Sequence, residues 1–392
     1  MIKFALRRNL IYVLQYIIWS FARDILIKFI NSIFNFSTSY IFVQLIFLGE
    51  ILAGAIIYLS LKKYNKKKKT QYFMSIKLRK SNNELQASDS KIKIFFLIFL
   101  LGFMDLVEFS LCNIYLPRLI NLSKSLFQRL IGITTMFSLF FYVYALKLPV
   151  YRHQKFSILI IGVCLIAIIV SEFFFQKNDI YSSHKSLSVA IAYIAIGQIL
   201  WSCMDSIEKY LFEYNFMNPF IVLMYEGTTG FFLSFLNLLD QNYFYDLVEI
   251  YKNNTTGKFI GFIFMLIAYI ILSGGKNIFR VITTKIYSPM VTTLQDYVLN
   301  PIYLIYYFCA HNDFKNNGKL YVLYFIINII ISLIISFFGC VYNEFIILFF
   351  CGLEYNTHDQ VSKRADIKIE EIEDINIELI KMNDEEISNN DN

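Results

Sequence analysis

Apolar residues fill this chain in long runs that are separated by short polar stretches. A helix that crosses a bilayer needs about 20 consecutive apolar residues, and the runs recur at about that length. The pattern therefore predicts transmembrane helices. The ten predicted spans lie near 9–31, 38–61, 93–114, 121–146, 155–175, 186–209, 218–239, 258–278, 287–309 and 320–350. The last run is too long for a simple span, so its end, 341–353, is expected to tilt or to follow the cytoplasmic interface.

Basic residues set the orientation of the predicted spans. The densest basic segment follows the second span, and smaller groups follow the fourth and eighth spans: Lys147, Arg152 and Lys155, then Lys276, Arg280 and Lys285. All of these face one side if the N terminus is cytoplasmic. We therefore expect a multi-pass membrane protein with both termini in the cytoplasm and no cleavable signal peptide. The pattern does not distinguish an endomembrane from the plasma membrane.

Two passages of the chain resemble one another. Trp19 opens WSFARDILIKFI and Trp201 opens WSCMDSIEKYLF, and one span later Glu50-x-x-x-Gly54 is echoed by Glu226-x-x-x-Gly230. A third echo joins Gln128-Arg129 to Gln295-Asp296. Five predicted spans separate the passages, and an odd number makes the second copy enter the membrane from the opposite side. This pattern is typical of inverted-repeat transporters.

The repeat predicts an all-α polytopic protein of ten transmembrane helices in two inverted five-helix repeats. The expected divisions are a first repeat over 1–175, with a basic cytoplasmic loop at 62–92, and a second repeat over 176–352. Residues 353–392 form an acidic cytoplasmic tail. From Glu354 onward the tail holds twelve acidic and four basic residues, so we expect disorder or a short amphipathic helix.

In this architecture the chain resembles the drug/metabolite transporter superfamily, which includes EamA-type exporters and nucleotide-sugar transporters. The resemblance covers residues 9–350 and rests on span number and internal symmetry. The ending VYNEFIILFFCGLEYNTHDQVSKRA is similar to that of uncharacterised protist members. The resemblance implies alternating-access transport of a small organic solute without naming that solute.

Ionisable residues inside apolar spans are costly to insert, so each is a candidate for function. Glu50 and Glu226 lie near the middle of their spans, each with a glycine one helical turn later that allows close approach. They serve either as protonated groups between packed helices or in solute and proton binding. Asp105 and Glu108 share a helix face, resist double ionisation and suit proton exchange.

Other polar residues are expected to pair or to break a helix. Asp24 with Lys28, and Asp205 with Lys209, stand at i,i+4 spacing near helix ends, where they would anchor the helix or gate the pathway. Arg129 and Asp296 occupy matching positions in the two repeats and would pair structurally. Asn300, which precedes a proline, and Gln295 are candidates for solute contact in a broken ninth helix.

The balance of charge in the spans indicates the class of solute. Five acids stand against one base, Arg129, if Lys276 and Arg280 are taken as cations at a helix end. An acidic cavity favours a cationic or neutral metabolite moved with protons, and a nucleotide-sugar antiporter is the alternative. A channel, receptor or non-transporting membrane protein is a further alternative.

Several functions are not favoured by the sequence. Its four histidines are dispersed outside the spans, and there is no Gly-rich phosphate loop, so we do not expect an enzyme. Its six cysteines lack metal-ligand spacing, and neither a metal nor a cofactor is predicted. The lysine cluster at 62–69 is expected to touch anionic lipid rather than nucleic acid. The expected partners are the bilayer and a small-molecule substrate, with a homodimer left open.

Overall fold

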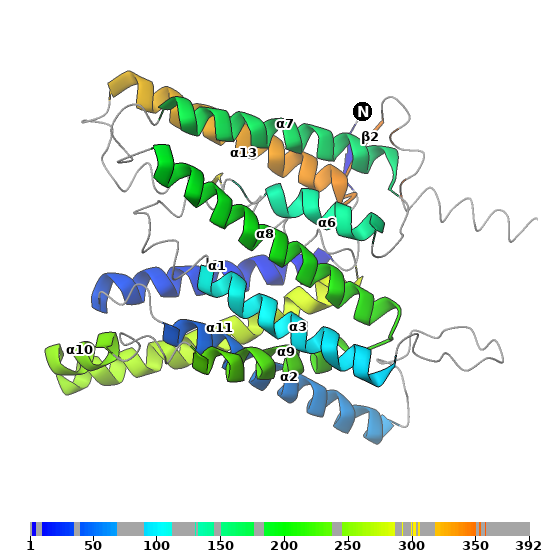
Figure 1. Ribbon diagram of the computed structural model, residues 1–392. Coiled ribbons are helices and arrows are strands. Elements are labelled where there is room, and N and C mark those ends of the chain that lie inside the picture. The colour runs from blue at the N-terminus through cyan, green and yellow to red at the C-terminus, as the bar shows by residue number, and fades with distance from the viewer. Residues whose placement is uncertain are drawn as a thin grey trace, which may run out of the picture.

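The computed structural model describes the helical core of the chain. The described residues are 2–4, 10–34, 40–68, 90–111, 132–144, 150–175, 184–236, 245–286 and 318–349, together with positions 130, 292, 299, 301, 302, 305, 353 and 357. The helices, labelled as in Figure 1, are α1 (Leu10–Phe34), α2 (Tyr40–Lys68), α3 (Lys91–Phe109), α6 (Gly132–Tyr144), α7 (Arg152–Phe175), α8 (His184–Glu213), α9 (Pro219–Ser234), α10 (Tyr245–Asn253), α11 (Thr256–Ile286) and α13 (Gly318–Tyr342).

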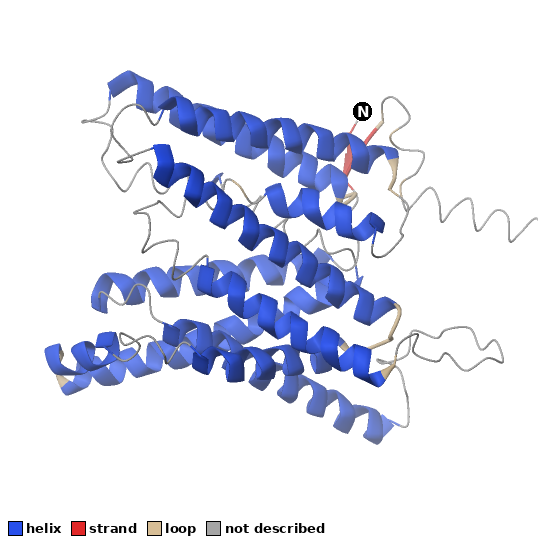
Figure 2. Cartoon of the chain, viewed as in Figure 1, coloured by secondary structure: helices blue, strands red, loops and turns tan. Residues whose placement is uncertain are grey.

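The protein is a helical bundle, as the apolar runs predict (Figure 2). Four described segments are long and apolar enough to cross a membrane: Ile41–Lys63, Arg152–Ser171, Thr256–Ile286 and Val322–Tyr342. At 1.5 Å per residue, α11 is about 46 Å long, which exceeds the roughly 30 Å hydrocarbon core of a bilayer. The length and composition of these segments are those of a membrane protein.

The distribution of side chains is inverted relative to that of a soluble protein, and α3 illustrates it. Phe95, Phe99 and Phe103 are exposed on its outer face, while Asp105 and Glu108 are buried on its inner face. An exposed aromatic stripe of this kind marks a surface that contacts an apolar environment. Lipid on the outside and polar groups on the inside account for both faces.

Helix contacts divide the bundle into a central group and a flank. α2 packs against α9 and α11, α3 packs against α9 and α8, and α1 packs against α11. On the flank, α7 lies along α13, and α6 packs against both α7 and α8 (Figure 1). The helices α2, α3, α9 and α11 therefore surround the centre of the bundle.

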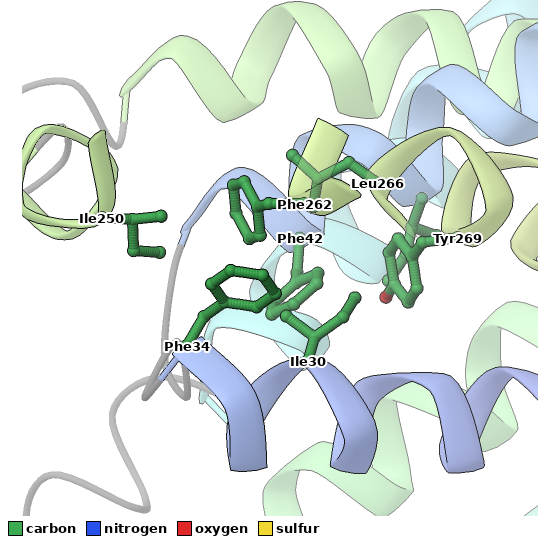
Figure 3. Packing of buried hydrophobic residues seen from close by; sticks show 8 residues of the cluster. Ile30, Phe34, Phe42, Ile250, Phe262, Leu266 and Tyr269 are labelled. Carbon is green, nitrogen blue, oxygen red and sulfur yellow. The ribbon is translucent and has the colours of Figure 1, made fainter. Parts of the chain in front are cut away.

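An apolar cluster closes one end of the central group (Figure 3). Ile30 and Phe34 of α1, Phe42 of α2 and Phe262 of α11 pack together there, with Ile250 of the short helix α10 beside them. The rings of Phe34 and Phe262 are 5.0 Å apart at their centroids. Aromatic packing of this kind fixes the spacing of α1, α2 and α11 at this end.

Glycines bring the central helices into backbone contact. A Cβ placed on Gly274 of α11 would lie 2.6 Å from the Gly49 carbonyl oxygen of α2. A Cβ on Gly102 of α3 would lie 2.8 Å from the Glu226 carbonyl oxygen of α9. Small residues at such crossings allow the close van der Waals packing that holds membrane helices together.

The glycine crossing gives a direct test of packing. Gly274→Ala is expected to lower the free energy of unfolding by about 1–3 kcal/mol, because the added methyl group has no room against α2. The matched control is Gly261→Ala in the same helix, where a Cβ would meet nothing within 4 Å. Thermal unfolding in detergent measures both variants. Equal midpoints for the two variants would show that the crossing tolerates a larger residue.

A short two-stranded pairing, which the sequence did not predict, accompanies the helical fold. β1 (Ile2–Phe4) pairs antiparallel with β2 (Ile346–Leu348), with Ile2 opposite Leu348. Residues 341–353 are the segment predicted to tilt or to follow the cytoplasmic interface. Within it, residues 346–348 instead form the buried strand β2. Glu344, two residues after the end of α13, has a positive φ of 60°, and the Phe345 N–H donates to the Cys340 carbonyl. This is the C-terminal motif that usually places a glycine at the left-handed position.

Candidate functional site

A cluster of ionisable side chains lies buried among α2, α3, α8, α9 and α11. Within the described residues it contains six carboxyl groups and two cations, and each of them is at most 5% exposed. Its members are Glu50, Asp105, Glu108, Asp205, Glu208, Glu226, Lys276 and Arg280. We refer to this set as the buried charge cluster.

Arg280 of α11 contacts three carboxyl groups of the cluster. Its Nη2 donates to both carboxylate oxygens of Glu226, at 3.0 and 3.1 Å. Its Nη1 lies 2.8 Å from a carboxylate oxygen of Glu208 and 3.6 Å from one of Asp205. One guanidinium thus holds carboxylates from α8 and α9, which suits its planar fork of donors.

Glu50 of α2 is held differently. Asn277, one helical position after Lys276, donates from Nδ2 to Glu50 Oε1 at 2.5 Å. The other carboxylate oxygen, Oε2, is buried and has no hydrogen-bond partner among the described residues. A neutral amide can satisfy a carboxyl group but cannot neutralise its charge. Glu50 thus makes its side-chain hydrogen bond with a neutral amide, whereas Glu226 and Glu208 contact the guanidinium of Arg280.

Asp105 and Glu108 of α3 complete the cluster. Asp105 lies within electrostatic range of Glu226, Arg280, Glu108 and Lys276. The side chain of Glu108 is buried beside it, one turn along the same face. The structure therefore brings together Glu50, Glu226, Asp105 and Glu108, four of the five carboxyl groups that the sequence singles out inside the spans.

Asp205 and Lys209 do not pair with each other, in contrast to the expectation from their spacing. Asp205 accepts from Trp201 Nε1 at 3.1 Å and from Thr292 Oγ1 at 2.7 Å, and it faces Arg280. Lys209 instead contacts Glu213 at 2.8 Å and donates to the Lys285 carbonyl at 3.0 Å. The long lysine stem reaches the helix end, where polar partners are available, while the short Asp205 side chain stays inside.

On α1, Asp24 forms a salt bridge with the adjacent Arg23 at 3.1 Å. Both Asp24 and Lys28 are partly buried on α1. Their role as an anchor or a gate stays a prediction. The candidates Arg129, Gln295, Asp296 and Asn300 lie outside the described residues, as do most of the basic loop and the acidic tail.

Lys276 and Arg280 are not among the site residues predicted from the sequence. There they are taken as cations at a helix end. Helix α11 continues to Ile286, so both residues lie within it, and they are 5% and 3% exposed. A signal for this was available in the sequence. Ser273, Asn277, Arg280 and Thr284 recur at three- and four-residue intervals, which places a polar stripe on one helix face, and all four are buried.

Comparison with known protein families finds none that matches this chain, and no curated protein is similar to it. The site is therefore interpreted from its own geometry.

Proposed function

We propose that this protein is a secondary-active transporter that moves a small organic solute by alternating access, with protons as the coupling ion. The observation that carries the proposal is the excess of acid in the buried charge cluster. Six carboxyl groups face two cations within the described residues. Burying unpaired charge costs several kcal/mol per ion, so the excess of acid among these residues favours neutralisation by protons or by a bound cation.

The pattern of helix contacts supports an inverted repeat. If α1, α2, α3 and α7 correspond to α8, α9, α11 and α13, the contact of α1 with α11 becomes that of α8 with α3. Likewise, the contact of α2 with α11 becomes that of α9 with α3, while the α2–α9 and α7–α13 pairs map onto themselves. Such exchange is expected of two halves related by a two-fold axis. It favours ten spans in two five-helix repeats, and with them membership of the drug/metabolite transporter superfamily.

The glycine crossings follow the same exchange. Gly274 packs on α2 beside Ala53, and Gly102 packs on α9 beside Thr229. Ala53 follows Glu50 by three residues, and Thr229 follows Glu226 by three residues. In this register Asp105 corresponds to Asn277, and Glu108 corresponds to Arg280. Each half thus supplies polar side chains at matching positions, which suits a site that opens to either side.

The contacts of Arg280 bear on the class of solute. Its guanidinium is shared among Glu208, Glu226 and Asp205, so an anion could bind it only by breaking these ion pairs. With its carboxyl groups ionised, the cluster would also repel an anion. A cationic or neutral solute is therefore favoured over a nucleotide sugar.

Uptake by the purified protein in proteoliposomes tests the proposal. A panel of amines, neutral metabolites and nucleotide sugars is offered with and without a pH gradient. We expect uptake of at least one amine or neutral solute, raised about tenfold by the gradient, since each pH unit is worth 1.4 kcal/mol per proton. Uptake of nucleotide sugars alone would reject the cationic or neutral class. No uptake of any solute would reject transport of these solute classes.

A further inference from the structure

Lys276 lies between two aromatic rings from different helices. Its Nζ is 5.8 Å from the ring centroid of Tyr16 on α1 and 5.7 Å from that of Trp201 on α8. Tyr16 is fully buried, and Lys276 is only 5% exposed. Ring faces attract ammonium groups through their quadrupoles, and desolvation strengthens the attraction. The two rings therefore form an aromatic site that already holds an ammonium group.

A carboxylate fixes one wall of this site. The indole N–H of Trp201 donates to Asp205 at 3.1 Å, and Asp205 is held in turn by Thr292 at 2.7 Å. These bonds set the orientation of the Trp201 ring and place negative charge at its edge. A rigid ring beside a fixed carboxylate is the kind of arrangement that binds methylated or primary ammonium groups.

The ammonium group of Lys276 could leave the rings of Tyr16 and Trp201 by side-chain rotation alone. Lys276 carries its charge on a flexible four-carbon stem, so rotation about its side-chain bonds would withdraw the ammonium without moving α11. Asp105 lies within electrostatic range of Lys276, which gives a displaced ammonium a carboxylate to approach. The rings of Tyr16 and Trp201 would then no longer face the Lys276 ammonium and could face that of a bound solute.

We propose that Tyr16 and Trp201 bind the ammonium group of an organic cation, and that Lys276 fills this site in the unloaded protein as a tethered competitor. The inference rests on the proposed transport function and narrows its solute class to organic ammonium compounds.

The test compares choline with 3,3-dimethylbutan-1-ol, which has the same shape but no charge. The chain has two tryptophans, so a Trp19→Phe variant reports on Trp201 alone by its fluorescence. We expect choline to change the emission with saturation and the neutral compound to leave it unchanged. Removing the competing charge with Lys276→Met should lower the Kd for choline at least about tenfold, because no tethered ammonium then competes for the ring faces.

Two further variants serve as matched controls. Lys276→Arg keeps a tethered cation and should leave the Kd within about threefold of the parent, which is under 1 kcal/mol. Lys209→Met removes a lysine of the same bundle that contacts Glu213 rather than the rings, and should do the same. Thermal shift with choline, measured without the Trp19→Phe change, repeats the comparison independently. An unchanged Kd in Lys276→Met, or an equal response to the neutral compound, would overturn the proposal.

Measurements of choline binding and of solute uptake together distinguish the aromatic site from the transport function. Gradient-driven uptake of a neutral solute by a protein that ignores choline would reject the aromatic site and keep the transporter. Tight choline binding by Lys276→Met without uptake of any solute would keep the aromatic site and reject transport.

Discussion

Replacement of Arg280 by glutamine is expected to destabilise the protein by about 3–5 kcal/mol, because it leaves buried carboxylates without their cation. Arg280 is shared by Glu208, Glu226 and Asp205, and all three are fully buried. Glutamine can donate hydrogen bonds to one of them but cannot balance their charge. The loss should shrink at low pH, because protonation then neutralises the same carboxyl groups. Unfolding in detergent across a pH series measures both effects.

A charge-conserving variant separates charge from geometry. Arg280→Lys keeps the positive charge but loses the two-point contact with Glu226 and the reach to Glu208, so its destabilisation should fall between wild type and Arg280→Gln. The external control is Arg152→Gln, at the start of α7 and outside the cluster. A pH-independent loss in Arg280→Gln would show that the variant disrupts packing rather than charge balance.

The replacement of Glu50 by glutamine should abolish the response of uptake to a pH gradient while the fold is kept. A glutamine oxygen can still accept from Asn277, so the free energy of unfolding should change by less than about 1 kcal/mol. The side chain can no longer gain or lose a proton. Uptake driven by the pH gradient should therefore fall at least about tenfold. Exchange of solute across the vesicle membrane should continue when the pH is equal on both sides.

Glu249→Gln is the matched control for Glu50→Gln, since Glu249 is exposed on the short helix α10. It should leave uptake unchanged with and without the gradient. If Glu50→Gln responds to the gradient as fully as the control, then Glu50 is a structural hydrogen-bonding group between α2 and α11 and does not carry the coupling proton.

The hydrophobic pattern of the sequence predicts much of the helical architecture. Each described helix except α10 overlaps a predicted apolar run, and the mid-run positions of Glu50, Glu226, Asp105 and Glu108 pointed to four residues of the buried charge cluster. Polar residues in an apolar run have few places to go other than the interior, so their burial follows from the membrane environment. The contact between Glu226 and Arg280 could not be derived in this way, because it depends on how α9 and α11 are rotated about their axes.

A further likeness between the two proposed repeats points to more residues of the site. The segments LGFMDLVEF and SGGKNIFRV align on Gly102 and Gly274, and they place Asp105 against Asn277 and Glu108 against Arg280. The likeness is hidden because the matched residues differ in charge. The β1–β2 pairing was inaccessible for another reason, since strand pairing between residues more than 300 positions apart is a tertiary contact without a local signal.

Solute-driven proton movement tests the central claim most directly. Proteoliposomes that contain a pH indicator are given an external solute identified by the uptake panel, with no pH gradient imposed. Wild type should change the internal pH as the solute enters, whereas the double variant Glu50→Gln/Glu226→Gln should give no change even where the solute still crosses. Solute entry into wild-type vesicles without any pH change, or an equal pH change in the double variant, would contradict a proton-coupled site in the buried charge cluster.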